Sequence, residues 1–204
     1  MIFMKAFKHW LGLAIYRKIK LLESYANMVE NNDIKKKFAF VGENVSFRCQ
    51  DSRIKGCQYI RVGNNFSVGK GFRLEAIDNY MLYRFSPEIV IGDNVRIEDY
   101  CHIGCVEKVV IGDGVLIASK VFISDHFHGK ITKDDIGVPP SNRPLSSKPV
   151  VIGNNVWIGD NVSILPGITL GNNVIIGANS VVTHSFPANS VIAGCPARII
   201  KILD

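Results

Sequence analysis

The amino-acid sequence predicts a mainly β protein: a parallel solenoid with an α-helical segment before it and one long protruding loop. Three observations support this fold class. An aliphatic residue returns every sixth position over residues 150–182, the first 32 residues repeat with helical spacing, and residues 127–149 carry four Pro and no periodicity. We therefore expect a helical segment at residues 1–38 and a β domain at residues 39–204, with its loop at about residues 127–149.

The six-residue repeat is the strongest pattern in the chain. It is clearest at Ile152, Ile158, Ile164, Leu170, Ile176 and Val182. Helices repeat near 3.6 residues and strands near 2, so a longer fixed repeat indicates a solenoid. Each unit has room for one short strand and one turn, and the Val and Ile content favours strands. The Gly-Asn-Asn and Gly-Asp-Asn groups suit tight corners, because Gly and Asn tolerate positive φ.

The same spacing recurs, with breaks of phase, from about residue 39. Its earlier positions are Val41 and Phe47; Val62, Val68 and Leu74; Ile91, Ile97 and Ile103; and Ile111, Ile117 and Ile123. Successive coils should stack at about 4.8 Å and bury these side chains in columns. The Pro-rich loop interrupts the stack, and loops of this length in a compact domain are usually functional.

The first 32 residues are expected to form a helix that stops near the Asn-Asn-Asp group at residues 31–33. Leu11, Leu21 and Tyr25 fall near one apolar stripe, which favours packing on the rest of the protein or on a partner subunit. The alternative is peripheral contact with a membrane surface, which Trp10 and the basic residues of this segment would suit.

The composition excludes several classes of protein. The 204 residues are 47% hydrophobic and 21% charged, which is typical of a folded chain. The net charge is +6, but no nucleic-acid-binding motif is present, so we expect no nucleic-acid partner. Five Cys without a CxxC pair argue against a disulfide framework and a zinc finger. We expect a cytoplasmic protein, at the inner face of the membrane if its helix contacts lipid.

The repeat also resembles a known family. VVIGNNVWIGDNVSILPGITLGNNVIIGANSVVT (150–183), followed by SFPANSVIAGCPARIIKI (185–202), resembles the hexapeptide-repeat acyltransferases, and the resemblance covers roughly residues 40–203. It implies a left-handed parallel β-helix with triangular coils, usually assembled as a homotrimer. VVIGDGVLIASKVFISDHFHG (109–129), the Pro-rich loop and the basic N-terminus are most similar to sugar O-acetyltransferases of bacterial surface-polysaccharide pathways (O-antigen, capsule or exopolysaccharide).

That resemblance implies transfer of an acetyl group from acetyl-CoA to a hydroxyl of a sugar or glycan precursor. The reaction needs a base for the hydroxyl proton, and His is suited because its ordinary pKa is near 6.5. His126 follows Ile123 by three residues, where the long loop leaves its coil, and the family's catalytic His occupies this place. We expect direct attack with His126 as the base, and His128 is the rival. Asp125 is not included, because adjacent residues on an extended chain point apart.

Two further residues are candidates for the acceptor site. His102, in EDYCHIG, reaches the acceptor pocket if its coil stacks near that of His126; the alternative is a structural hydrogen bond at a corner. Trp157, in VWIGD, stands where the family often has an aromatic residue near the acyl group. The alternative for Trp157 is ordinary packing.

The C-terminal coils are expected to bind the acyl carrier. In the family, coenzyme A lies between two subunits of the trimer, with its pantetheine arm along the coils and its phosphates near basic residues. Matched motif by motif, the cofactor-binding residues are Gly159, Ala178, Thr183, His184, Arg198 and Lys201. Guanidinium groups suit phosphate oxygens. The alternative for the two basic residues is that they only solubilise the terminal segment.

Three other functions stay open at this point. Acylation of an amino sugar would use the same site. A zinc-dependent carbonic-anhydrase-like enzyme of the same fold would use three His, and His102, His126 and His128 invite the comparison. A non-catalytic scaffold would need neither the loop nor the terminal basic pair. We expect no metal, because zinc would leave the carrier motif unexplained.

Overall fold

The structure is a computed structural model that describes residues 2–130 and 132–203, so Ile131 of the predicted loop lies outside the described part. The chain divides into two compact units between Lys36 and Lys37. The first unit is α1 (Ile2–Lys35), which continues slightly beyond the stop predicted from the sequence. Of its predicted stripe, Leu21 and Tyr25 are more than half exposed, and Leu11 is 43% exposed. In the described residues, no helix has an apolar stretch long enough to cross a bilayer.

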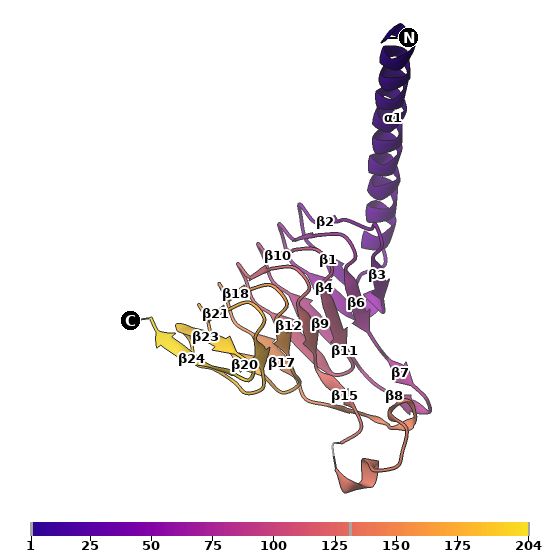
Figure 1. Ribbon diagram of the computed structural model, residues 1–204. Coiled ribbons are helices and arrows are strands. Elements are labelled where there is room, and N and C mark those ends of the chain that lie inside the picture. The colour runs from indigo at the N-terminus through magenta and orange to yellow at the C-terminus, as the bar shows by residue number, and fades with distance from the viewer. Residues whose placement is uncertain (1, 131, 204) are drawn as a thin grey trace. The chain divides into compact units, whose positions relative to one another are not determined.

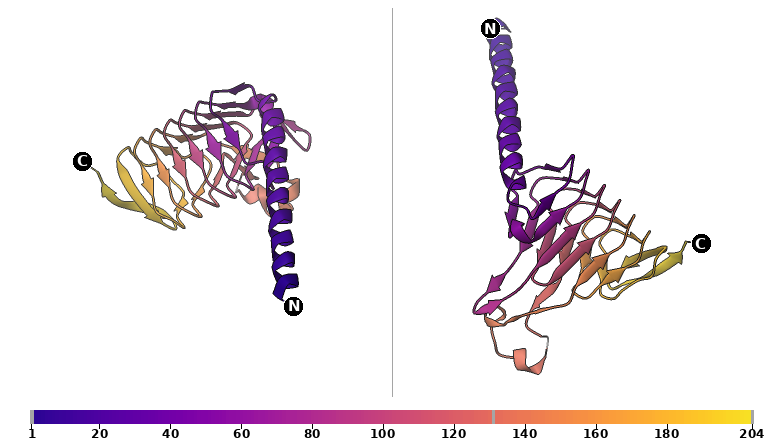
Figure 2. Two further views of the ribbon diagram at one scale, coloured as in Figure 1. Left: turned by 90° about the horizontal axis from the view of Figure 1, so that it is seen from above. Right: turned by 180° about the vertical axis from the view of Figure 1, so that it is seen from behind.

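The second unit is a stack of coils whose strands form three sheets along the stack, here named A, B and C (Figures 1 and 2). Sheet A contains β1 (Phe40–Val41), β4 (Ile60–Val62), β9 (Glu88–Ile91), β12 (Lys108–Ile111), β17 (Val150–Ile152) and β20 (Thr169–Leu170). Sheet B contains β2 (Ser46–Phe47), β5 (Ser67–Val68), β10 (Arg96–Ile97), β13 (Leu116–Ile117), β18 (Trp157–Ile158), β21 (Ile175–Ile176), β23 (Ser190–Gly194) and β24 (Ala197–Ile202). Sheet C contains β3 (Arg53–Lys55), β6 (Arg73–Ala76), β11 (His102–Cys105), β14 (Phe122–Ser124), β19 (Ser163–Ile164) and β22 (Val181–Val182).

The chain visits the three sheets in turn, so one strand from each sheet makes a coil. Within every sheet the neighbouring strands come from successive coils and run parallel, as β11 does with β6 and β14. Among the described strands of these three sheets, only the last strand of sheet B, β24, folds back antiparallel, onto β23. The predicted β-helix solenoid is therefore confirmed.

The aliphatic columns fill the inside of the coils as predicted. Every predicted position from Phe47 to Val182 is buried, and only Val41, in the first coil, is half-buried. A second buried column lies two residues earlier in each turn, at positions such as Val156, Val162 and Val174. Burial of two aliphatic columns gives the stack its hydrophobic core, which no coil could form alone.

The corners depend on Asn and Gly. Asn155, Asn173 and Asn189 have positive φ, and their side-chain amides hydrogen-bond from coil to coil, at 3.4 Å from Asn155 to Asn173 and 2.8 Å from Asn173 to Asn189. Gly153 is required for a different reason. A Cβ there would come within 2.6 Å of the Asn172 side-chain oxygen in the next coil. The Gly-Asn-Asn group therefore combines a close approach between coils with a left-handed corner.

Two hairpins leave the stack near sheet C. The first is β7 (Asn79–Tyr80) with β8 (Tyr83–Arg84). This hairpin lies between Leu74 and Ile91, where the six-residue repeat is interrupted. The second is β15 (His126–His128) with β16 (Leu145–Ser147), which forms the base of the predicted loop. Two short 3-10 helices lie between β15 and β16: η2 (Lys133–Asp135) and η3 (Pro140–Asn142). A third 3-10 helix, η1 (Cys57–Tyr59), precedes β4. The predicted loop is thus partly ordered by strand pairing.

Candidate active site

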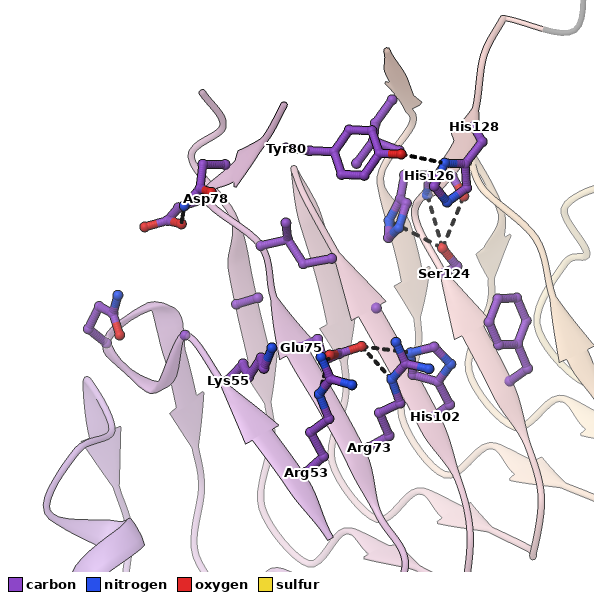
Figure 3. Close-up of a pocket in the computed structure, with 18 residues that line it drawn as sticks. Arg53, Lys55, Arg73, Glu75, Asp78, Tyr80, His102, Ser124, His126 and His128 are labelled. Atoms are coloured by element: carbon purple, nitrogen blue, oxygen red, sulfur yellow. Dashed lines mark hydrogen bonds and ion pairs between the residues drawn. The ribbon is translucent and has the colours of Figure 1, made fainter. Parts of the chain in front are cut away.

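A pocket of about 640 Å³ lies on the outer face of sheet C (Figure 3). Its floor is made by β3, β6, β11 and β14, and residues of the two hairpins border it. Strand register places the outward side chains in two rows that cross the coils. The first row is Arg53, Arg73, His102 and Phe122, and the second is Lys55, Glu75, Gly104 and Ser124.

His126 lies at one end of this pocket, at the start of β15. Its side chain is 14% exposed, and its Nδ1 lies 2.9 Å from Asp125 Oδ1. The Ser124 hydroxyl is also near Nδ1, at 3.3 Å. Because a carboxylate can only accept, Nδ1 is assigned the proton, which leaves a lone pair on Nε2. The imidazole therefore has the tautomer that a general base needs.

Asp125 is fully buried and is held by the main chain. The backbone N–H groups of Val106, Glu107 and Lys108 all donate to its carboxylate, at 2.7 to 3.1 Å. Burial opposes ionisation, but the hydrogen bonds from His126 and from the Glu107 and Val106 amides outweigh it. As a result, the pKa of Asp125 lies below its ordinary value. Asp125 is therefore an ionised, fixed partner for His126.

The contact between Asp125 and His126 corrects the expectation that these side chains point apart. Side-chain alternation holds within a strand, but β14 ends at Ser124 and β15 begins at His126. Asp125 lies at the corner between them, where the chain leaves the coil. Its N–H still bonds to Gly104 of the preceding coil, and its carbonyl accepts from Lys148 where the hairpin returns. The geometric reason for excluding Asp125, that its side chain points away from His126, is therefore wrong.

His102 lines the same pocket from the preceding coil, as the sequence interpretation required. Its Nε2 lies 3.5 Å from the buried Glu75 carboxylate. Burial, reinforced by the nearby Arg73 guanidinium, lowers the pKa of His102 below its usual value. A Cβ on Gly104 would lie 3.2 Å from His126 Cε1 and 3.6 Å from His102 Nε2, so this glycine leaves room for both rings.

His128 is exposed at the rim of the pocket. Its Nδ1 lies 3.3 Å from the Tyr80 hydroxyl, and Tyr80 donates to the Ser141 carbonyl at 2.7 Å. His128 therefore joins the two hairpins, and no carboxylate contacts its ring among the described residues. In the part of the chain that the structure describes, no group of three His, Cys, Asp or Glu is arranged to hold a metal ion.

The remaining predicted residues lie elsewhere on the stack. Trp157 is 52% exposed on sheet B and does not line the pocket. None of the predicted carrier residues lines it either: Gly159, Ala178, Thr183, His184, Arg198 and Lys201. Gly159 and Ala178 stack on one corner, since a Cβ on Gly159 would lie 2.7 Å from the Ala178 nitrogen. Arg198 and Lys201 are exposed on β24. Thr183 and His184 lie beyond β22, at another corner.

Comparisons with known proteins agree with this architecture. The family model described as bacterial transferase hexapeptide (six repeats) matches residues 149–184. WbbJ of Escherichia coli K12, assigned to lipopolysaccharide biosynthesis as an O-acetyl transferase, is 49% identical over 146 residues, which cover 70% of this chain and 71% of WbbJ. The chain belongs to the hexapeptide-repeat acyltransferase family.

Two further relatives support this membership. Galactoside O-acetyltransferase of Escherichia coli K12 is 36% identical over 186 residues, or 89% of this chain and 73% of that enzyme. A solved structure of galactoside acetyltransferase in complex with coenzyme A is 33% identical with a TM-score of 0.51, covering 84% of this chain and 68% of that one. The enzyme class predicted from the sequence, an acyl-CoA-dependent O-acetyltransferase, is confirmed by these relatives.

Proposed function

We propose that this acyltransferase moves an acetyl group from acetyl-CoA to a hydroxyl of a saccharide during the synthesis of a cell-surface polysaccharide, in the cytoplasm. The observation that supports it best is the imidazole of His126. Its Nδ1 is tied to the buried Asp125 carboxylate at 2.9 Å, while the ring lines a pocket of about 640 Å³. WbbJ and galactoside O-acetyltransferase favour a saccharide acceptor.

In this mechanism His126 acts first as base and then as acid. Nε2 accepts the proton of the acceptor hydroxyl as its oxygen attacks the thioester carbonyl. When the C–S bond breaks, Nε2 returns that proton to the leaving sulfur, so the products are an acetyl ester and free coenzyme A. The Asp125 carboxylate stabilises the positive charge on the ring between the two steps. His102, on β11, which pairs with the strand β14 that leads into His126, is assigned to hydrogen-bond the acceptor.

The carrier residues remain assigned to the C-terminal coils. Gly159 and the exposed Ala178 leave a corner without bulky side chains, along which a pantetheine arm fits. Arg198 and Lys201 are exposed cations on β24, suited to phosphate oxygens. Because these residues do not line the pocket that holds His126, we place the complete site between subunits of a homotrimer. Thr183, His184 and Trp157 are assigned to the same interface.

A thiol-release assay with acetyl-CoA and a panel of saccharides tests the proposal. Release of free thiol that depends on the saccharide, with an O-acetyl product, supports it. A product carrying an N-acetyl group would favour the amino-sugar alternative. Release without transfer, or no coenzyme A binding in calorimetry, would contradict it. Metal analysis of the purified protein tests the expectation that no zinc is required.

A further inference from the structure

The end of the pocket away from His126 is rich in cations. Arg53 and Lys55 come from β3 and Arg73 from β6, and all three line the pocket (Figure 3). The only carboxylates among the lining residues are Glu75 and Asp78. Asp78 accepts a hydrogen bond from the Tyr59 hydroxyl at 3.0 Å, at the margin of the pocket. Positive charge therefore exceeds negative charge on this part of the wall.

Glu75 fixes the two guanidinium groups. Its side chain is 5% exposed, and it contacts Arg53 Nε at 3.1 Å and Arg73 Nε at 2.5 Å. Each arginine therefore approaches the Glu75 carboxylate through its Nε. Within the described chain, the Nη groups of Arg53 and Arg73 donate no hydrogen bond, and Lys55 makes no hydrogen bond or ion pair. Three groups of donors consequently remain available to a ligand.

Such an arrangement is suited to an anion. Guanidinium Nη edges match the oxygens of a phosphoryl or carboxylate group, and fixing the arginines in advance reduces the entropy lost on binding. The two lining carboxylates, Glu75 and Asp78, leave one positive charge unbalanced among the three cations. A neutral saccharide would need hydroxyl-binding groups here, but not a surplus of charge.

The strand order gives the distance between the arginines and His126, and so the length that the ligand must span. Arg73 on β6 is separated from β14, which leads into His126, by β11 alone. Two strand spacings amount to about 10 Å. One sugar ring with a substituent spans this range, so the reacting hydroxyl and the anion can belong to neighbouring parts of one acceptor.

We infer that the acceptor is an anionic saccharide whose phosphoryl or carboxylate group is bound by Arg53, Lys55 and Arg73 while its hydroxyl lies at His126. This inference rests on the proposed acetyl transfer and adds the charge of its substrate. Glu75 is a positioning residue, since it acts by holding the two arginines. His102 lies between the anion and the base, in contact with the same Glu75.

The test compares a neutral methyl glycoside, a glycosyl phosphate, a nucleoside diphosphate sugar and a uronic acid glycoside of the same sugar. We expect kcat/KM at least about 10-fold higher for one or more of the charged acceptors, and a KM that rises with salt. The member of the panel that is preferred identifies the source of the charge. R73Q should remove about 10-fold of that preference, measured as the ratio of kcat/KM for the charged acceptor to kcat/KM for the neutral glycoside.

Two other variants make the result decisive. K55Q should reduce the preference several-fold. Lys55 is the register neighbour of Glu75, but among the described residues the ion pairs of Glu75 are with Arg53, Arg73 and His102, so K55Q leaves both arginines their partner. R96Q is the matched control: Arg96 also pairs through Nε with a Glu two residues later, at 2.7 Å, but it lies on sheet B outside this pocket. Equal use of neutral and charged acceptors by the wild type, or equal losses for both in R73Q and K55Q, would overturn the inference. If no acceptor is acetylated, the proposed function fails, and calorimetry with the glycosyl phosphate still tests the anion site: binding must weaken in K55Q and not in R96Q.

Discussion

At the scale of single residues, the proposed mechanism depends on the imidazole of His126. H126A should lower turnover on the order of 10²-fold or more, because the acceptor hydroxyl loses its base. Coenzyme A affinity should be nearly unchanged, because the predicted carrier residues lie on other coils. Steady-state kinetics and calorimetry check the two expectations. H9A, on α1, serves as the control, and full turnover in H126A together with a loss in H128A would move the assignment to His128.

Asp125 is expected to contribute through His126. In D125N the side-chain oxygen can still accept from the backbone amides, but its NH₂ group cannot accept from Nδ1. The ring should then favour the wrong tautomer, and turnover should fall on the order of 10²-fold. D113N is the matched control, since Asp113 accepts a backbone N–H at a corner where Asn154 and Asn172 do the same in the following coils. Unchanged turnover in D125N would exclude the role in catalysis.

The same carboxylate predicts how stability depends on pH. The pKa of Asp125 is lower in the folded protein than its ordinary value. Its stabilising contribution is therefore present above the unfolded pKa of about 3.9 and is lost as the pH falls through the lower folded pKa. The gap in melting temperature between wild type and D125N should be widest near neutral pH and should shrink below about pH 4. A gap that stays constant on acidification would contradict this.

The sequence predicted some residues of this candidate site and not others. His126 and His102 were found because each has a place in the repeat and a chemistry of its own. Asp125 was missed because its contact depends on the backbone turning between two strands, which residue alternation does not describe. Glu75 and Arg73 were missed although a signal existed. They flank the repeat position Leu74, just as His102 and Gly104 flank Ile103, and therefore face outward in the same rows.

At the scale of elements, the coil spacing brings the two histidines together over Gly104. G104A would place a Cβ 3.2 Å from His126 Cε1, so the ring must shift by a few tenths of an ångström. We expect turnover to fall about 10-fold, since small displacements of catalytic groups are costly, while the melting temperature changes little.

G159A is the contrasting variant on another coil. Its Cβ would meet the Ala178 nitrogen at 2.7 Å and the Ile176 carbonyl at 2.9 Å, and neither backbone atom can move aside easily. G159A should therefore lose about 1–3 kcal/mol of stability.

For G104A, full turnover would contradict the prediction. It would show that the packing around the two imidazole rings is looser than the structure indicates.

The coils were predictable for a physical reason that does not extend to the hairpins. Each coil repeats the same burial and corner requirements, so the pattern is written many times along the chain. The β15–β16 pair occurs once, joins residues about twenty positions apart and uses polar residues such as Ser146 and Ser147. No periodicity marks it, and the Pro-rich stretch between its strands hides it further.

At the scale of the whole molecule, one chain holds the parts of the proposed site apart. His126 lies in the pocket on sheet C, whereas Arg198 and Lys201 lie on β24 of sheet B. A cyclic assembly can join the pocket of one subunit to the β24 of the next, and closed rings are the usual form of such head-to-tail contacts. Since the family resemblance implies three subunits, we expect a homotrimer in sedimentation equilibrium.

Subunit complementation tests whether the parts come from different chains. H126A and the double variant R198A/K201A should each be nearly inactive at limiting acetyl-CoA. Co-expressed with two different tags and purified through both, they form mixed trimers in which one interface has both His126 and the basic pair intact. Each mixed trimer should then have about one third of the wild-type activity, because one of three equivalent sites is complete. If base and basic pair belonged to the same chain, every site would carry one defect and the mixed trimers would stay inactive.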